Sequence, residues 1–164
     1  MSSVEEYAAH PRIERIARLR RTADELAEAI VGYGADQLTR RPGPGAWAAV
    51  EVIGHLRDSE EWFVVRCGFI LAMDEPRFPR NNPDRWADER QYLRHDAKVA
   101  VDSFRRQRAE MLGLFGALAT DDWKRGGVHS DSRGRRTVDD FLSVMAWHDD
   151  NHLDQLCRAL DGRP

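Results

Sequence analysis

Two histidines near the end of the chain, His148 and His152, stand four residues apart in the stretch MAWHDDNHLDQL. On an α-helix, side chains at positions i and i+4 lie one above the other on the same face, so both imidazoles can turn toward one ion. The spacing therefore predicts a helical metal chelate. Because an H-x-x-x-H pair also arises by chance on exposed helices, the hypothesis requires a third ligand from an upstream segment.

His55 is the upstream histidine best placed to be that ligand. It lies in WAAVEVIGHLRDSEEWF, at the edge of an apolar stripe on a predicted helix, so its imidazole can reach the interior of a helical bundle. His10 precedes a proline at the start of the chain, His129 lies in a glycine-rich loop, and His95 lies between two charged residues, where a solvated side chain is expected. Three neutral imidazoles without a fourth protein ligand are typical of a catalytic site whose open position takes water or a thiolate.

Four long helical patterns position these histidines. Apolar residues recur at helical spacing over about residues 11–32, 48–73 and 88–118, and a T-x-x-D capping box at 137–140 opens a last helix that carries the histidine pair. The proline-rich segment DEPRFPRNNPDRW precedes the third helix, and we expect TDDWKRGGVHSDSRGRR to fold back as a small hairpin. No strand pattern is long enough to build a sheet. The sequence predicts an all-α, antiparallel four-helix bundle with a long crossover connection, as a single domain over residues 1–164.

Composition and charge exclude several classes of function. A net charge of −3 gives no basic face for nucleic acid. No window approaches the roughly 18 consecutive apolar residues that span a bilayer, and the first residues carry no apolar leader, so we expect a cytoplasmic protein without a membrane partner. The cysteines, Cys67 and Cys157, lie far apart in helical patterns, which favours reduced thiols without a catalytic role.

Two acidic residues, Glu60 and Asp149, project onto the apolar stripes of their helices, where an unpaired carboxylate is expensive to bury. One interpretation gives them catalytic work, either as acceptors of the free N–H of a metal-bound imidazole or as proton acceptors near the open site. The other pairs them with an arginine or a backbone group across the bundle. Asn151 and Gln155 also lie near the histidine edge, where they either contact a substrate or face solvent.

Two segments of the chain resemble proteins of the DinB-like family. AWAAVEVIGHLRDSEEW is similar to their W-x-x-x-E-x-x-x-H-L-x-D-x-E segment, and TVDDFLSVMAWHDDNHLDQL is similar to their last helix, with its H-x-x-x-H-x-x-Q ending. The resemblance implies the same four-helix bundle and a divalent ion held by one histidine of the second helix and two of the fourth, here His55, His148 and His152. Ala48 departs from the family, which usually has Ser or Thr as the helix cap at this position.

The resemblance also carries expectations about function. The family includes bacillithiol- and glutathione-dependent S-transferases and proposed metal-dependent hydrolases, and mycothiol-dependent maleylpyruvate isomerase is a relative. The leading expectation is a thiol-dependent S-transferase that activates a low-molecular-weight thiol at the metal and acts on a small molecule. Hydrolysis by metal-activated water and a non-catalytic, metal-binding stress-response role stay open.

The identity of the ion and the assembly are expected on similar grounds. Imidazole ligands suit several divalent ions, with zinc or nickel preferred and iron, cobalt, manganese and copper left open. Family members commonly pair through bundle helices, so we expect a homodimer. Trp62, Val64 and Phe69 are more apolar than a solvated face of the second helix requires, and they would supply its interface.

Overall fold

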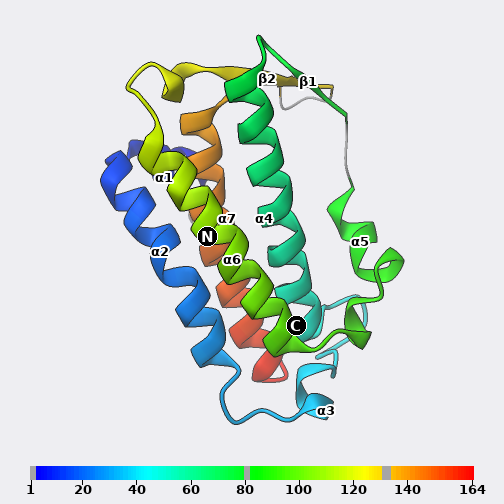
Figure 1. Ribbon diagram of the computed structural model, residues 1–164. Helices are drawn as coiled ribbons and strands as arrows, with labels where there is room; N and C mark the ends of the chain where they lie inside the picture. Colours follow the sequence, from blue (N-terminus) through cyan, green and yellow to red (C-terminus); the bar gives the residue numbers. More distant parts are fainter. Residues whose placement is uncertain (1–2, 80–81, 131–133) are drawn as a thin grey trace.

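A computed structural model describes residues 3–79, 82–130 and 134–164 and confirms the all-α four-helix bundle (Figure 1). Its long helices are α2 (Arg12–Ala29), α4 (Ala49–Ala72), α6 (Ala97–Ala117) and α7 (Val138–Leu160). The shorter elements are α1 (Val4–Ala9), α3 (Ala35–Leu38), β1 (Arg77–Phe78), α5 (Pro83–Glu89), η1 (Tyr92–Arg94), η2 (Asp122–Lys124), β2 (Gly126–His129) and β3 (Arg135–Thr137). None of the described helices is long and apolar enough to cross a lipid bilayer.

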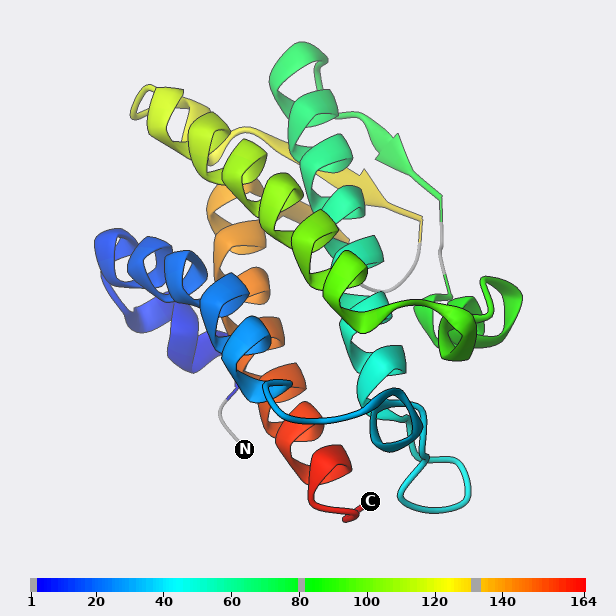
Figure 2. The same cartoon turned by 60° about the horizontal axis from the view of Figure 1, so that its bottom comes forward.

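The crossover between α4 and α6 determines the topology of the bundle. It returns the chain along the outside of the bundle to the end at which α4 begins, so α6 runs in the same direction as α4 while α2 and α7 run the opposite way (Figures 1 and 2). Helix α4 packs against both α6 and α7, and α2 packs against the same two helices. The histidine-bearing helices α4 and α7 are therefore antiparallel neighbours.

The third bundle helix begins later than the sequence predicts. It starts at Ala97 rather than at residue 88, because Gln91 adopts a left-handed backbone conformation with φ of 53° that ends the preceding helical segment. The side chain of Asp96 then accepts a hydrogen bond of 3.0 Å from the Val99 backbone N–H and caps α6. As a result, His95 belongs to the connection and not to the helix.

A small sheet closes one end of the bundle, contrary to the prediction of no sheet. The expected hairpin is present as the antiparallel pair β2 and β3, and β1 adds to β2 in parallel. These strands have two to four residues each, too few to produce a periodic signal in the sequence. Strand β3 leads directly into α7, where the Thr137 hydroxyl accepts a hydrogen bond from Asp140 N–H at 3.1 Å, as the capping box predicts.

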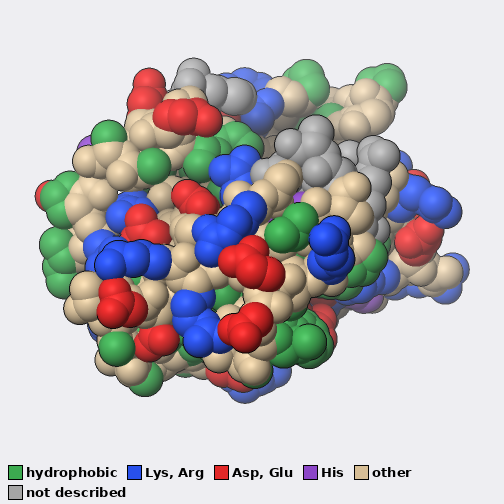
Figure 3. Space-filling model, turned by 90° about the horizontal axis from the view of Figure 1, so that it is seen from above, with side chains coloured by type: hydrophobic (Ala, Val, Ile, Leu, Met, Phe, Trp, Pro, Cys, Tyr) green, Lys and Arg blue, Asp and Glu red, His purple; other side chains and the backbone are tan. Residues whose placement is uncertain are grey.

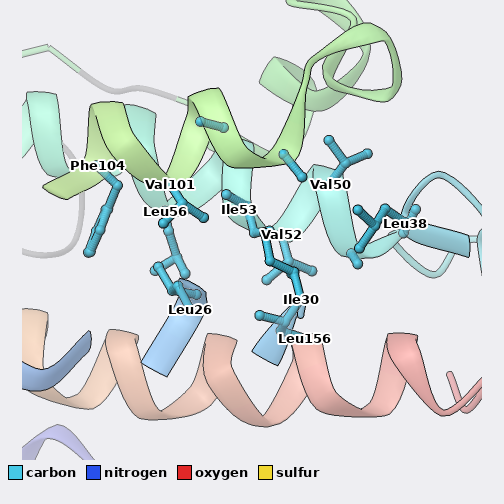
Figure 4. Packing of buried hydrophobic residues seen from close by; sticks show 14 of the residues in the cluster. Leu26, Ile30, Leu38, Val50, Val52, Ile53, Leu56, Val101, Phe104 and Leu156 are labelled. Carbon is cyan, nitrogen blue, oxygen red and sulfur yellow. The ribbon is translucent and has the colours of Figure 1, made fainter. Parts of the chain in front are cut away.

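Apolar side chains from all four long helices fill the lower half of the bundle (Figure 4). Leu26 of α2, Ile53 and Leu56 of α4, Phe104 of α6 and Leu156 of α7 are each at most 1% exposed. Seen from the end of the bundle that is uppermost in Figure 1, basic and acidic side chains are interspersed over the surface (Figure 3). This face offers no single-sign field of the kind that attracts a polyanion.

Candidate metal centre

The three histidines predicted as ligands come together between α4 and α7. Ligand nitrogens of His55, His148 and His152 all lie within 4.8 Å of one another. His55 Nε2 lies 3.0 Å from His148 Nε2, and the ring centroids of His55 and His152 are 4.5 Å apart. The imidazoles therefore converge on one point, as the spacing within α7 and the antiparallel packing of α4 beside it allow.

The donor set fits a divalent metal ion. In a tetrahedral zinc site with bonds of about 2.0–2.1 Å, neighbouring nitrogens are roughly 3.3 Å apart, which is close to the separation of the His55 and His148 nitrogens. His152 Nδ1 donates a hydrogen bond of 2.8 Å to Gln155 Oε1. Because the proton is then on Nδ1, the Nε2 lone pair of His152 is available to the cluster.

Burial keeps two of these imidazoles in the neutral form that ligates metals. Burial, followed by the nearby His152, lowers the pKa of His55 to about 3. The pKa of His148 is also well below its usual value, chiefly because of burial and then because of the other two histidines. Neutral imidazoles carry the lone pair that a cation requires, so no proton has to leave these two rings at neutral pH.

Aromatic rings hold the histidines in place. The Trp47 ring lies 5.0 Å from the His55 ring and stacks on the His152 ring at 6.3 Å, and the edge of Phe63 meets the His148 ring at 5.9 Å. His55 Nδ1 is buried and has no hydrogen-bond partner among the described residues, so the packing of Trp47 orients this ring. Sequence reasoning gave Trp47 no role in the site, although it opens the W-x-x-x-E-x-x-x-H pattern.

The acidic residues Glu60 and Asp149 are bound to an arginine in the middle of the bundle. Both are 1% exposed. Arg108 Nε and Nη2 donate to the two Glu60 oxygens at 2.8 Å each, while its Nη1 and Nη2 donate to Asp149 at 2.6 and 3.0 Å. Burial alone would lower the pKa of Arg108, but the two carboxylates outweigh it and raise that pKa. Both acids thus take the arginine-paired arrangement that the sequence left open.

This ion cluster connects all four bundle helices. Thr22 of α2 donates a hydrogen bond to Asp149 of α7, and Arg108 of α6 joins both to Glu60 of α4. Sequence reasoning anticipated an arginine partner without naming one. A signal was present, since Arg108 shares the helical stripe of the buried residues Phe104, Met111 and Phe115, where a lone cation requires a buried counter-charge.

The other histidines lie outside the cluster. His10 is exposed, and the half-buried His95 has its Nδ1 3.3 Å from an Arg57 nitrogen. His129 on β2 is buried between the rings of Phe78 and Phe141. It borders a cavity next to the cluster but is not one of the converging ligands.

Two cavities meet at the histidine cluster. One, of about 490 Å³, is lined by His55, His148 and His152 together with Trp47, Trp147, Gly45 and Gln155. The other, of about 200 Å³, shares His55 and His148 and extends toward the sheet, past Ser59 and Trp62. An ion at the histidines is therefore accessible from two separate spaces. Asn151, in contrast, donates its side-chain hydrogen bond back to the Trp147 carbonyl at 2.8 Å.

Comparison with known sequences gives matches over most of the chain. The sequence profile of the DinB superfamily matches residues 18–156. YfiT of Bacillus subtilis, described as a proposed metal-dependent hydrolase, is 22% identical over 129 residues that span 79% of this chain and 72% of YfiT. OB0413 of Oceanobacillus iheyensis, described in the same way, is 20% identical over 151 residues that span 90% of this chain and 84% of that protein.

Solved structures with the same fold are also found. The YfiT structure, described as a four-helix bundle of unusual topology, matches with a TM-score of 0.85 at 20% identity and covers 93% of this chain and 89% of YfiT. Mycothiol-dependent maleylpyruvate isomerase matches with a TM-score of 0.72 at 11% identity, over 95% of this chain and 63% of the isomerase. At these identities the structural likeness shows the fold alone. Together with the three-histidine cluster, the named relatives support a metal-binding enzyme.

Proposed function

Because the chain belongs to the DinB superfamily, we propose that it is a divalent-metal-dependent transferase that joins a low-molecular-weight thiol to a small electrophile. The observation that carries this proposal is the meeting of two cavities at His55 and His148. A transfer between two small molecules needs two binding spaces that share one reactive point. Zinc or nickel is the preferred ion, and no nucleic acid or membrane partner is proposed.

His55, His148 and His152 would hold the ion, and Gln155 would fix the ring of His152 through the hydrogen bond to Nδ1. When bound, a divalent ion supplies a Lewis acid that lowers the pKa of a thiol or a water molecule beside it. Trp47 packs against the rings of His55 and His152 on one side of the cluster. The larger cavity, on the Trp47 side, is the proposed place for the thiol.

The arginine pairing of Glu60 and Asp149 favours a thiol over water as the nucleophile. Both carboxylates are held by Arg108, so neither is offered to the histidine cluster as a proton acceptor. A thiol has a pKa of roughly 8.5 and loses its proton without a strong protein base, whereas water is far less acidic. We assign Glu60 and Asp149 as positioning residues, which hold α4 and α7 in the alignment that brings the histidines together.

The proposed reaction is a substitution at carbon. The thiol loses its proton to solvent, the sulfur–carbon bond forms, and the bond from that carbon to the leaving group breaks as the leaving group departs with the electron pair. The second candidate is hydrolysis, in which water takes the place of the thiol. The descriptions of YfiT and OB0413 as proposed hydrolases favour it.

A parallel screen tests the two candidates. Zinc-loaded and nickel-loaded protein would each be incubated with a chromogenic aryl halide in four parallel reactions. These reactions contain bacillithiol, mycothiol, glutathione or no thiol. We expect halide release that depends on one of the thiols and on metal, with the thioether identified by mass spectrometry. Metal-dependent turnover of esters or amides without any thiol would favour the hydrolase. Bound metal with neither activity would favour a non-catalytic metal-binding role.

We also propose a cytoplasmic homodimer. On α4, Val65 and Phe69 lie four residues apart, and Met73 follows four residues later, just after the helix ends; they are 44%, 49% and 51% exposed. With the half-buried Trp62 they form an apolar strip of the kind that protein interfaces cover, whereas Val64 packs against the core of the bundle. Sedimentation at micromolar concentration should show a dimer, and Phe69→Glu should convert it to a monomer. A wild-type monomer would reject the dimer without affecting the metal site.

A further inference from the structure

Ser59 is a buried hydroxyl beside the histidine cluster. It follows His55 by four residues of α4, so the two side chains lie on the same face of the helix. Ser59 is 8% exposed, and its Oγ lies 3.5 Å from Nε2 of His55. It lines the smaller cavity but not the larger one. Ser59 is therefore a polar group of the smaller cavity, next to a ligand that both cavities share.

The hydroxyl proton of Ser59 has no strong acceptor among the described residues. A buried serine on a helix can donate to the carbonyl four residues earlier, as Ser143 of α7 does to Asp139 at 3.2 Å. Within the part of the chain that the structure describes, Ser59 makes no such bond, and its 3.5 Å contact with His55 Nε2 is longer than an ordinary hydrogen bond. That contact ends when Nε2 binds an ion, because the ion takes the lone pair. The proton is then available to a molecule in the cavity.

Aromatic rings form much of the wall around this hydroxyl. Trp62 stacks on Trp86 with ring centres 5.9 Å apart, and Phe63 meets Phe141 edge to face at 6.0 Å. Ser59 is the one hydroxyl-bearing side chain among the described residues that line the cavity. A hydrogen bond donated in such apolar surroundings is stronger than in water, because little solvent screens it.

The basic residues of the cavity lie farther from the histidine cluster. Arg66 follows Ser59 by seven residues, about 10 Å along the axis of α4, and its guanidinium packs on the ring of Phe78 in β1. Arg136 and His129 lie on strands β3 and β2. These groups therefore lie toward the sheet, whereas Ser59 is one helical turn from a metal ligand.

The arrangement of the two cavities puts Ser59 on the side where a leaving group would depart. The larger cavity is the proposed place for the thiol, which leaves the smaller one for the electrophile. The sulfur–carbon bond then forms on the side of the larger cavity, and the leaving group departs on the opposite side of that carbon. Negative charge collects on the leaving atom as its bond to carbon breaks, and a hydrogen-bond donor beside this atom stabilises the charge.

We infer that Ser59 is a catalytic residue of the smaller cavity, where its hydroxyl donates a hydrogen bond to the leaving atom of the electrophile. Ser59 keeps its proton: the sulfur–carbon bond forms, the bond from carbon to the leaving atom breaks, and that atom departs with the electron pair, while the thiol proton goes to solvent. This role rests on the proposed function and deepens it, since it requires a leaving atom that accepts hydrogen bonds strongly, an oxygen or a chloride. The cavity volume of about 200 Å³ suits an electrophile of about one ring.

Binding of a leaving-group analogue tests the role of Ser59 without turnover. Zinc-loaded protein without thiol would be titrated with 4-nitrophenolate, whose absorbance reports binding. We expect Ser59→Ala to weaken binding about ten-fold or more, the usual effect of losing a hydrogen bond to a charged group. Ser59→Thr keeps the hydroxyl and should bind within about three-fold of wild type.

Ser143→Ala is the matched control. Ser143 is also a buried helical serine, but its hydroxyl is already bonded to Arg15 and to the Asp139 carbonyl. This variant should bind 4-nitrophenolate like wild type. Circular dichroism and metal analysis would establish that all three variants are folded and loaded.

Turnover gives a second readout. With a thiol that supports the proposed reaction, Ser59→Ala should lower kcat about 10–100-fold for benzyl chloride but only slightly for benzyl iodide, because iodide is a much weaker hydrogen-bond acceptor. A merely structural role would lower both rates equally.

Three results would overturn the role of Ser59. They are equal affinity of wild type and Ser59→Ala for 4-nitrophenolate, no binding of this anion at millimolar concentration, and an equal loss of rate with the two halides. If no thiol supports turnover, the proposed transfer fails, and the titration still decides whether Ser59 donates to an anion in the cavity.

Discussion

Arg108 of α6 donates two hydrogen bonds, of 2.6 and 3.0 Å, to Asp149 of α7, the residue that follows the proposed metal ligand His148. Replacing Asp149 by Asn removes one of two carboxylates that balance a buried guanidinium, which typically costs about 3 kcal/mol of unfolding free energy. We expect Asp149→Asn to lower the melting temperature similarly with and without metal, and to change metal affinity only a few-fold. Asp150→Asn is the matched control, because Asp150 is 40% exposed and should cost at most about 1 kcal/mol.

The opposite pattern would contradict this assignment. Unchanged stability of the metal-free Asp149→Asn protein, together with a 10–100-fold loss of metal affinity, is the usual result of losing a partner that orients a ligand. Asp149 would then serve the histidines directly.

Metal content tests the three-histidine site. Protein purified without chelator should carry close to one divalent ion per chain, because three imidazoles converge on one point. His148→Ala should lose most of the metal in elemental analysis. His95→Ala and His129→Ala should keep it, since neither residue belongs to the cluster. Equal metal content in His148→Ala and wild type would refute the site.

Gln155 should tune the affinity of the site. It accepts the Nδ1–H hydrogen bond of His152 and so keeps the other ring nitrogen directed at the cluster. Gln155→Ala should weaken metal binding about 10-fold or more, measured by competition against a chelator, whereas Gln155→Glu keeps an acceptor oxygen and should bind nearly as well as wild type. If Gln155→Ala binds metal normally, packing alone orients His152.

Acid should destabilise the metal-free protein through the buried histidines. The pKa of His55 falls from 6.5 to about 3 on folding, so the unfolded chain binds more protons between these values. Its contribution to stability is therefore complete above pH 6.5 and is lost as the pH falls below it. At pH 5 the loss is about 2 kcal/mol from His55 alone.

Urea denaturation at pH 7.5 and pH 5 checks this expectation. His55→Gln lacks the titrating ring, so its unfolding free energy should fall about 2 kcal/mol less than that of wild type over this interval. Equal decreases in the unfolding free energy of wild type and His55→Gln would mean that the His55 ring can take up a proton in the folded state.

Gly54 should be required for the crossover to pack on α4. A Cβ atom at this position would lie 2.8 Å from Cγ of the buried Tyr92 ring, and that ring is held by a 2.6 Å hydrogen bond from its hydroxyl to Asp58. Gly54→Ala should therefore cost about 1–3 kcal/mol of unfolding free energy. Gly68→Ala, in the same helix with open space around it, should stabilise by about 0.5–1 kcal/mol. Similar effects at both glycines would show that Tyr92 can move aside.

Much of the bundle and the convergence of the three histidines could be predicted from sequence because they depend on local geometry. Helical periodicity and the Thr137 capping box placed α7, and the i, i+4 rule put His148 and His152 on one face of it. The apolar stripe of α4 brought His55 to the interior. The start of α6 was predicted wrongly, since the left-handed conformation of Gln91 leaves no trace in the apolar pattern.

The role of the buried acids and the shape of the site depended on contacts between distant segments. Sequence showed that Glu60 and Asp149 needed partners, but only the packing of α6 against α4 revealed Arg108 as the shared one. Arg136 belonged to a charged loop, and only the pairing of β2 with β3 turned it into the cavity while Arg135 faced outward. Periodicity determines which face of one element is buried, whereas the partner that meets this face is decided by how the helices and strands pack in three dimensions.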